Sequence, residues 1–318
     1  MVQPESPPPA GLDDLLTTIE RVIVVKRHAV RLVMVALLCQ GHVQIEDVPG
    51  IGKTLLAKTL AAALDWTFRR LQFTPDMLPS DITGSNVFNQ QSAQFEFRAG
   101  PVFANVVLAD EINRATPRTQ SALLEAMEER QVSVDGVSLA LPRPFLVAAT
   151  QNPVELEGTF PLPEAQLDRF LLRLRIGYPS AGEEAEILER FARDDPVSEV
   201  GPAVDVSSLL AWQRRRASVR VAPDVRDYLL GLVRATREHA DVALGASPRA
   251  ALGVYRACQA WALLEGRDFV IPDDVKLLLA PALAHRLVLS AGGRLRGASA
   301  DAVLQSVLDG GEVPVEAP

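Results

Sequence analysis

Two patterns of apolar residues alternate along the first part of the chain: helical spacing and short apolar runs. Apolar residues three and four positions apart are typical of helices with one buried face, and they cover residues 12–40, 54–64 and 119–129. Short runs between them are typical of strands, and they cover residues 43–46, 106–109 and 145–150. Two of these runs, 106–109 and 145–150, are almost continuously apolar, as in strands buried inside a parallel sheet.

Strands that alternate with helices predict an α/β fold, with helices covering both faces of a parallel sheet. A break near residues 24–28 is expected to split the first helical stretch. Alternating residues around an Asp-Gly pair predict a β-hairpin at 132–141. Leu and Arg alternate over 171–176, which predicts a strand at the edge of the sheet.

After residue 178 the pattern changes to helices alone. The expected helices cover residues 183–193, 206–217, 223–238, 248–265 and 272–288. We therefore expect one domain over residues 11–178 and an all-helical domain over 179–318. Residues 1–10 are Pro-rich and polar, so a disordered tail is expected there. The Gly-, Pro- and acid-rich residues from about Gly292 are expected to form a flexible end.

Composition limits the classes of function. The 318 residues are 48% hydrophobic and 23% charged, which suits roughly two domains with full cores. A net charge of −8 disfavours nucleic acid as a partner. No signal-peptide pattern is evident, and no apolar run approaches the ~20 residues of a membrane-spanning helix. We expect a cytoplasmic protein whose two cysteines, Cys39 and Cys258, are small buried hydrophobes.

A phosphate-binding loop is the most informative motif. Residues 47–54 read Asp-Val-Pro-Gly-Ile-Gly-Lys-Thr, between a predicted strand and a predicted helix. Backbone N–H groups of such a turn cradle phosphate oxygens, while Lys53 would reach the β- and γ-phosphates and the Thr54 hydroxyl would hold Mg²⁺. The motif usually has Gly at position 47, but Asp tolerates left-handed backbone and lets the turn close. The predicted nucleotide-binding residues are Val48, Pro49, Gly50, Ile51, Gly52, Lys53, Thr54 and Leu55.

The apolar strand at 106–109 ends in two carboxylates, Asp110 and Glu111. In a phosphate-cleaving site the first would lie near the metal ion, usually through a bound water. The second would polarise the attacking water as general base. Such pairs are common at strand ends, so it is the position downstream of a phosphate-binding loop that favours a catalytic role.

Three further polar residues each allow two interpretations. Asn152 follows the strand at 145–150 and either forms a simple Asn-Pro turn or contacts the γ-phosphate. Arg169 either pairs on the surface with Asp168 or Glu164, or neutralises γ-phosphate charge in a neighbouring subunit. Arg249 follows a Ser-Pro helix start and is either a solvated first-turn residue or faces back to the nucleotide from the helical domain.

Longer motifs resemble those of the MoxR family of AAA+ ATPases. The similarity runs in family order from about residue 12 to 290, and its motifs are residues 46–54, 72–76, 109–115, 149–153, 160–170 and 244–250. The resemblance implies a P-loop αβα core with a parallel sheet, followed by a C-terminal all-helical lid domain. It also implies ATP hydrolysis with ATP and Mg²⁺ as ligands. Asp at position 47 is usual in this family.

The resemblance also implies roles for the uncertain residues. Asn152 is similar to sensor 1, Arg169 to the arginine finger and Arg249 to sensor 2, so these three join Glu111 in the expected catalytic set. Thr54 and Asp110 are the expected metal ligands, and Arg114 is expected to reach across a subunit interface. Val25 and Lys26 stand where the family often has Gly-Gln, in the stretch that lines the adenine pocket.

Expected partners also follow from the resemblance. Related proteins form homo-oligomeric rings, and a hexamer is expected here. They act as chaperone-like remodellers that mature client proteins, for example by metal insertion or complex assembly, often with a von Willebrand A domain partner. Residues 80–100 resemble the insert in helix 2 of this clade, and 132–141 resemble the hairpin before sensor 1. Both features tend to face the pore or one surface of the ring.

Two other classes of function remain open from the sequence. One is a nucleic-acid motor, because the replicative MCM helicases share the helix-2 insert. The acidic balance, and the lack of Lys or Arg in residues 132–141, argue against it. The other is a nucleotide-gated switch with negligible turnover. The complete set of Asp110, Glu111, Asn152 and Arg169 argues against that class.

Overall fold

A five-stranded parallel sheet forms the centre of the first domain. The computed structural model describes residues 11–23, 27–47, 50–152, 158–192 and 196–314. The strands lie in the order β2 (Phe68–Gln72), β5 (Val106–Asp110), β8 (Leu146–Gln151), β1 (Val43–Glu46) and β9 (Leu172–Leu174). All four pairings between neighbouring strands are parallel, which confirms the predicted parallel sheet. The edge position of β9 is confirmed, whereas β2 was not predicted.

Both faces of the sheet are covered, as predicted. Alternate residues of a strand point to opposite faces, and β5 divides its side chains between two separate cores. Val106 and Leu108 pack in the larger core with α1 (Leu12–Val22), α2 (Arg27–Leu38) and α3 (Lys53–Ala63). Val107 and Ala109 pack in the second core with α5 (Pro117–Glu129). The predicted break between the first two helices is also present.

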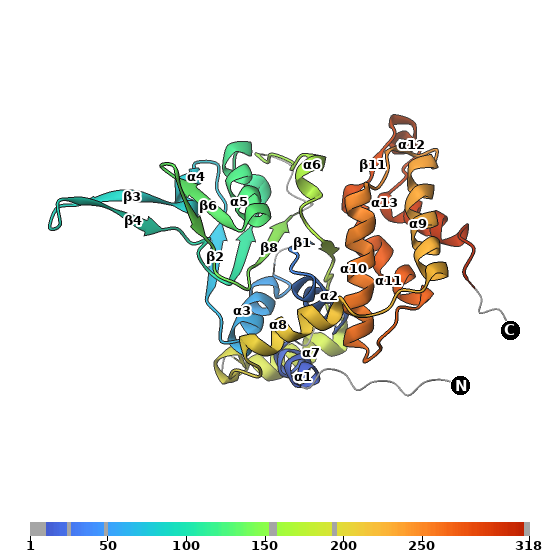
Figure 1. Ribbon diagram of the computed structural model, residues 1–318, viewed down its shortest axis with the longest axis horizontal. Coiled ribbons are helices and arrows are strands. Elements are labelled where there is room, and N and C mark those ends of the chain that lie inside the picture. Colours follow the sequence, from blue (N-terminus) through green and yellow to red (C-terminus); the bar gives the residue numbers. More distant parts are fainter. Residues whose placement is uncertain (1–10, 24–26, 48–49, 153–157, 193–195, 315–318) are drawn as a thin grey trace.

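Two β-hairpins extend from the sheet domain. The predicted hairpin forms strands β6 (Gln131–Val134) and β7 (Val137–Ala140), with Asp135 and Gly136 at φ 49° and 81° in its turn. A second hairpin, β3 (Gly84–Asn89) and β4 (Gln94–Ala99), follows the short helix α4 (Pro79–Thr83) and projects far from the body (Figure 1). Asn86 of this longer hairpin donates a 2.6 Å hydrogen bond to Asp135.

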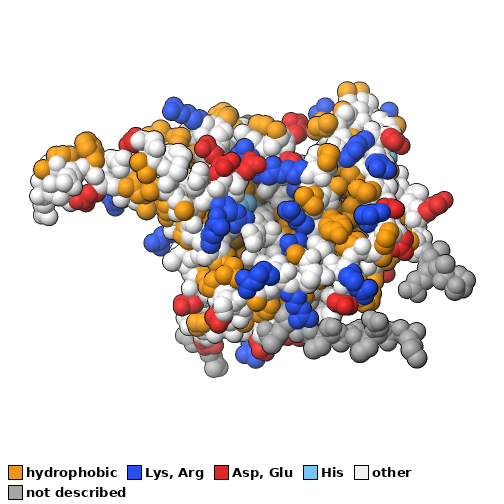
Figure 2. All heavy atoms as spheres, in the orientation of Figure 1, with side chains coloured by type: hydrophobic (Ala, Val, Ile, Leu, Met, Phe, Trp, Pro, Cys, Tyr) orange, Lys and Arg blue, Asp and Glu red, His pale blue; other side chains and the backbone are white. Residues whose placement is uncertain are grey.

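An exposed aromatic pair lies near the projecting end of the β3–β4 hairpin. Phe88 and Phe95 lie opposite each other across the two strands, with ring centroids 5.4 Å apart. Phe95 is 72% exposed, and hydrophobic side chains gather at this end in the space-filling view (Figure 2). At the base of the hairpin, a Cβ on Gly84 would lie 2.3 Å from the backbone oxygen of Arg98, so only Gly fits.

Helices dominate the rest of the chain, as expected. They are α7 (Ala181–Phe191), α8 (Val206–Arg216), α9 (Pro223–Glu238), α10 (Pro248–Leu264) and α11 (Pro272–Leu283), with 3₁₀ turns η2 (Pro196–Glu199) and η3 (Ala284–Arg286). Helix α8 packs against α2, where Gln213 donates a hydrogen bond to the Leu37 carbonyl. Helices α9, α10 and α11 stand together on the other side of the molecule (Figure 1).

The end of the chain differs from expectation. The helix predicted over 272–288 ends at Leu283 and is followed by η3 and by β11 (Val288–Leu289), which pairs with β10 (Val242–Leu244). The flexible end predicted from Gly292 is wrong up to Asp309, because this stretch forms α12 (Ala291–Leu295) and α13 (Ala300–Asp309). Ser299 caps α13, which buries Val303, Leu304 and Val307 at helical spacing.

Two smaller expectations concern membranes and cysteines. Within the described ranges, no helix combines the length and apolar character needed to cross a bilayer. Cys258 is buried and Cys39 is partly buried, and both are free thiols, which fits the expected structural role. Burial raises the pKa of the Cys39 thiol to about 12, which keeps the thiol protonated at neutral pH.

Candidate active site

The phosphate-binding loop joins β1 to α3, as the sequence predicts. Gly50 and Gly52 have φ values of 87° and 89°, and α3 begins at Lys53. A Cβ at either glycine would meet no heavy atom within 4 Å, so it is the left-handed backbone that favours glycine. The loop therefore turns sharply and directs the first N–H groups of α3 towards its own concave side. Val48 and Pro49 lie outside the described residues.

Asp47 has a different function from the one expected. It is not among the residues with positive φ, so tolerance of left-handed backbone is not the reason for Asp at this position. Its carboxylate Oδ2 instead accepts hydrogen bonds from the backbone N–H groups of Ile176 (2.5 Å) and Gly177 (2.6 Å). The side chain thus ties the start of the loop to the chain leaving β9.

A cavity of about 380 Å³ lies beside the loop and collects most of the predicted site residues. It is lined by Gly50, Gly52, Lys53, Thr54, Leu55, Arg70, Asp110, Glu111, Thr150 and Asn152. The carboxyl ends of β1, β5 and β8 meet here, which is why residues far apart in sequence share one cavity. Asn152, which follows the central strand β8, is buried at 8% exposure. We call this cavity the phosphate pocket.

Lys53 lies within the phosphate pocket. Its Nζ donates a 2.8 Å hydrogen bond to the backbone carbonyl of Asp47. Burial lowers the pKa of Lys53, and the nearby carboxylates of Asp110, Asp47 and Glu111 act in the opposite direction. The ammonium is therefore held in the loop with three negative side chains close by.

Asp110 has partners that the sequence analysis missed. Its Oδ1 accepts a 2.6 Å hydrogen bond from the Thr150 hydroxyl, which orients the carboxylate. Its Oδ2 pairs with the Arg70 guanidinium of the neighbouring strand β2. No motif pointed to Arg70, because β2 has mixed polar residues and was not recognised as a strand of the sheet.

Glu111 has a strained backbone at the end of β5. Its φ of 57° and ψ of 47° lie in the left-handed region, which is rare for a residue with a side chain. The Thr150 hydroxyl oxygen accepts a 2.9 Å hydrogen bond from the Glu111 N–H. Gln72 donates a 2.8 Å hydrogen bond to Glu111 Oε2, and Arg114 pairs with the same oxygen at 3.1 Å. In the isolated chain, Arg114 thus has a partner within its own subunit.

An apolar cavity of about 240 Å³ lies on the other side of the loop. It is lined by Val22, Ile23, Ala29, Gly50, Ile51, Gly52, Leu55, Leu56, Ile176, Pro179, Ile187 and Phe191. Apolar walls next to a phosphate pocket suit the base of a nucleotide. Val25 and Lys26, which the sequence places near the adenine, lie outside the described residues. Their neighbour Ile23 and residue Ala29 do line this cavity.

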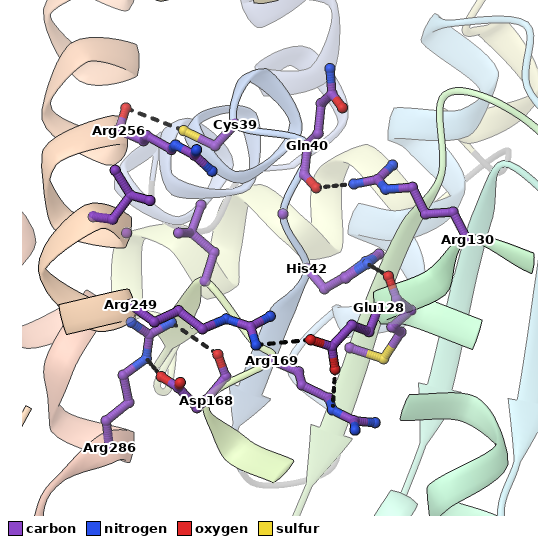
Figure 3. Close-up of a pocket in the computed structure, with 15 residues that line it drawn as sticks. Cys39, Gln40, His42, Glu128, Arg130, Asp168, Arg169, Arg249, Arg256 and Arg286 are labelled. Carbon is purple, nitrogen blue, oxygen red and sulfur yellow. Dashed lines mark hydrogen bonds and ion pairs between the residues drawn. The ribbon is translucent and has the colours of Figure 1, made fainter. Parts of the chain in front are cut away.

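The two arginines singled out by sequence lie together, away from the phosphate pocket. Arg169 Nε lies 2.9 Å from Glu128 Oε2, and Arg249 Nη1 lies 2.9 Å from Glu128 Oε1 (Figure 3). Glu128, near the end of α5, was not recognised as a site residue, because nothing local in the sequence indicates this long-range contact. The observed partner of Arg169 is thus Glu128, and not Asp168 or Glu164, the two surface partners considered from the sequence.

The pocket around these arginines lies at the opposite end of β1 from the phosphate-binding loop. It has a volume of about 190 Å³, and its walls include Gln40, Gly41 and His42, just before β1, and Leu171, just before β9. The loop follows the other end of the same strand. Arg249 therefore does not face the phosphate pocket of its own chain, which corrects the expectation from sequence. We call this second pocket the arginine pocket.

A buried histidine forms part of the arginine pocket. His42 Nδ1 accepts a 3.0 Å hydrogen bond from the Val147 N–H, and its Nε2 lies 3.1 Å from the Met127 carbonyl. Burial, with Arg130 nearby, lowers the pKa of His42 to about 3. The neutral ring with its proton on Nε2 satisfies both contacts, so this residue links β1, β8 and the end of α5 without a charge.

A phosphate-binding loop at the end of β1, a carboxylate pair at the end of β5, the strand β8 between them and a helical C-terminal region define an AAA-type P-loop ATPase. A family model described as "ATPase family associated with various cellular activities (AAA)" matches residues 42–172, and one described as "AAA lid domain" matches residues 234–307.

Individual relatives narrow the class to a family. The chain is 44% identical over 306 residues to Chaperone MoxR1 of Mycobacterium tuberculosis, covering 93% of this chain and 81% of that protein. It is 48% identical to protein YeaC of Bacillus subtilis, covering 94% and 93%. A crystal structure of an ATPase candidate from Cytophaga hutchinsonii superposes with a TM-score of 0.90 at 36% identity, covering 96% and 95%. The chain belongs to the MoxR family of AAA+ ATPases.

Proposed function

We propose that this ATPase hydrolyses Mg²⁺-bound ATP at sites shared between neighbouring subunits of a ring. One observation carries the proposal. Arg169 and Arg249 lie side by side on Glu128, at the far end of β1 from Lys53. A four-residue strand is roughly 13 Å long, which is farther than either arginine can reach to its own phosphate pocket. The phosphate that these arginines serve belongs to another copy of the chain.

The residues of the phosphate pocket have separable roles in this proposal. Lys53 and the N–H groups at the start of α3 bind the β- and γ-phosphates. The Thr54 hydroxyl and the Asp110 carboxylate lie in the same cavity and are hard oxygen ligands, which suits Mg²⁺. The described residues include no cluster of three His, Cys, Asp or Glu side chains that could hold a metal ion. A Mg²⁺ ion held by Thr54 and Asp110 would therefore take further ligands from the nucleotide. When bound, Mg²⁺ neutralises charge on the phosphate oxygens.

Glu111 is the residue proposed to accept the proton of the attacking water. Its carboxylate lines the phosphate pocket, and it is held by Gln72 and Arg114 in the chain as described. Asn152 follows the neighbouring strand in the same cavity and orients the water or the γ-phosphate. Arg169 and Arg249 of the next subunit neutralise the charge that develops on the γ-phosphate.

The biological role proposed is chaperone-like remodelling by a homo-oligomeric ring, with a hexamer as the expected size. The name of the mycobacterial relative, Chaperone MoxR1, supports this role. Metal insertion or complex assembly on a client protein, with a von Willebrand A domain partner, is proposed from the family resemblance alone. Nucleic acid is not proposed as a partner, because the chain is acidic and residues 132–141 contain neither Lys nor Arg.

Mixing two inactive variants tests the shared site. Lys53→Ala removes the phosphate ligand and should abolish ATP binding by its own subunit, while Arg169→Ala should bind ATP but lose about 10³-fold in turnover. In mixed rings, an Arg169→Ala subunit next to a Lys53→Ala subunit has a complete site. Random mixing should restore roughly a quarter of the interfaces, because the site is heterologous.

A chain that carries both substitutions is the matched control. Mixed with Arg169→Ala subunits it can complete no site, so this mixture should stay inactive. If the mixture of single variants is also no more active than its components, Arg169 serves its own chain and the proposal is wrong.

A further inference from the structure

A buried arginine of the helical domain holds the segment that carries Arg169. Arg286, at the end of η3, is 8% exposed. Its Nη2 donates hydrogen bonds to the backbone carbonyls of Phe170 (2.7 Å) and Asp168 (3.4 Å). Its Nε lies 3.2 Å from Asp168 Oδ1 (Figure 3). A single guanidinium thus contacts both neighbours of Arg169 in the chain.

Residues of α10 and η3 lie against Arg286. Gly253 of α10 packs against it, and a Cβ there would lie 3.2 Å from Nη1, so a larger residue would crowd the guanidinium. His285 Nε2 lies 3.0 Å from the Phe170 carbonyl, which gives the same backbone oxygen a second contact from η3. Burial lowers the pKa of Arg286 to about 10, so the guanidinium still carries its charge at neutral pH.

The cluster of Arg169, Arg249 and Glu128 joins the sheet domain to the helical domain. Arg249 is on α10 of the helical domain, while Arg169 and Glu128 belong to the sheet domain. The helical domain therefore supports Arg169 in two ways. Arg286 contacts the backbone on both sides of Arg169, and Arg249 pairs with Glu128, the carboxylate that also pairs with Arg169. Geometry at an active site must be held to a fraction of an ångström, so this support bears on turnover.

We propose that Arg286 is a positioning residue for Arg169, so that the helical domain of one subunit sets how that subunit presents its arginine to the next subunit's ATP. This inference rests on the proposed function, because it needs Arg169 to act across the interface. In this proposal Arg286 acts through Arg169 and not on the nucleotide. Its contribution is to fix the backbone on both sides of Arg169, which a flexible loop would otherwise leave variable.

The test replaces Arg286 by Met, which keeps much of the volume and removes the charge and the hydrogen bonds. Turnover of assembled Arg286→Met should fall roughly 10- to 100-fold, since misplacement of a catalytic group has effects of this size. The KM for ATP should change less than about twofold, because the phosphate pocket lies at the other end of β1. Arg296→Met is the matched control: it removes another ion pair of the helical domain, with Asp241, and should leave turnover unchanged.

Two further measurements separate positioning from a general structural effect. A chain with both Arg286→Met and Arg169→Ala should be no slower than Arg169→Ala alone, because residues that act as a unit are not additive. Mixed rings of Arg286→Met and Lys53→Ala subunits should regain activity, because the defect of the first lies in what it supplies to its neighbour. A misfolded subunit would not be rescued in this way.

The outcomes distinguish this inference from the proposed function. If Arg169→Ala keeps full turnover, the proposed function fails. If Arg169→Ala loses turnover but Arg286→Met does not, or its loss adds fully to that of Arg169→Ala, only the positioning of Arg169 by Arg286 is wrong. Should Arg286→Met not fold or assemble, Asp168→Asn removes the same ion pair from its more exposed side and is carried through the same measurements.

Discussion

Arg70 holds Asp110 in a two-pronged ion pair, with Nη2 2.5 Å and Nε 3.1 Å from the same carboxylate oxygen. Arg70 lies on β2, next to β5 in the sheet, and its side chain is half exposed at the mouth of the phosphate pocket. The carboxylate expected to bind the metal ion therefore has a cationic partner within its own chain. Mg²⁺ held by Asp110 would compete with this guanidinium for the carboxylate.

Replacing Arg70 should therefore change the requirement for magnesium. In Arg70→Met, the Mg²⁺ concentration for half-maximal ATP hydrolysis should fall roughly two- to fivefold, since half-exposed ion pairs contribute up to about 1 kcal/mol. A magnesium titration at saturating ATP measures this change. Arg69→Met is the matched control, because Arg69 is the preceding residue on β2 and makes no ion pair with Asp110. An unchanged or higher requirement in Arg70→Met would show that Arg70 does not compete with the metal.

Glu111→Gln should separate ATP binding from ATP cleavage. The amide keeps the size of the side chain but cannot accept the proton of water, so turnover should fall at least 10²-fold while nucleotide affinity stays within about threefold. Titration with a fluorescent ATP analogue and a steady-state phosphate assay measure the two properties. Turnover retained in this variant would exclude Glu111 as the general base, and weaker binding alone would indicate a role in holding nucleotide.

Buried histidines should make the fold sensitive to mild acid. The pKa of His42 is lowered to about 3 in the folded chain from 6.5, and that of His285 is lowered likewise. As the pH falls below about 6.5, the unfolded chain binds protons that the folded chain does not. Stability is thus fully present above this pH and is lost as the pH falls towards 3. Each histidine contributes a slope of up to about 1.4 kcal/mol per pH unit in this range.

Urea unfolding of His42→Gln at several pH values between 7 and 5 measures the contribution of His42. Gln can still donate and accept a hydrogen bond but does not titrate in this range. The dependence of unfolding free energy on pH should be shallower than in the parent chain by about 1 kcal/mol per unit. Equal slopes for the two chains would mean that His42 binds its proton alike in the folded and unfolded states.

Features that depend on local pattern could be predicted from the sequence. The phosphate-binding loop, β5, β8 and the β6–β7 hairpin each have a continuous signal, either an apolar run or a turn motif. Strand β2 was missed because its Arg69, Arg70 and Gln72 are polar and exposed, so the strand lacks an apolar pattern. The end helix α13 was missed because glycines and acidic residues around it outweighed the spacing of Val303, Leu304 and Val307.

Contacts between distant segments could not be predicted in this way. Glu128 and Arg286 lie on ordinary helical segments, and only the packing of α5, α10 and η3 brings them to Arg169 and Arg249. Asp47 shows a related limit. Its identity was explained by backbone conformation, whereas the structure gives it two N–H donors from the end of β9. The sequence thus identified the residues of the phosphate-binding motifs more readily than the distant residues that position them.

The projecting β3–β4 hairpin gains a further meaning from the proposed assembly. In the proposed ring, each subunit receives arginines at one face and supplies arginines at another. Subunits therefore associate head to tail, and the two sides of the ring differ. Rotation about the ring axis then repeats each hairpin at the same height and radius. Each subunit would then place one aromatic pair, Phe88 and Phe95, near the outer end of its hairpin. The distances between these pairs would change whenever neighbouring subunits tilt.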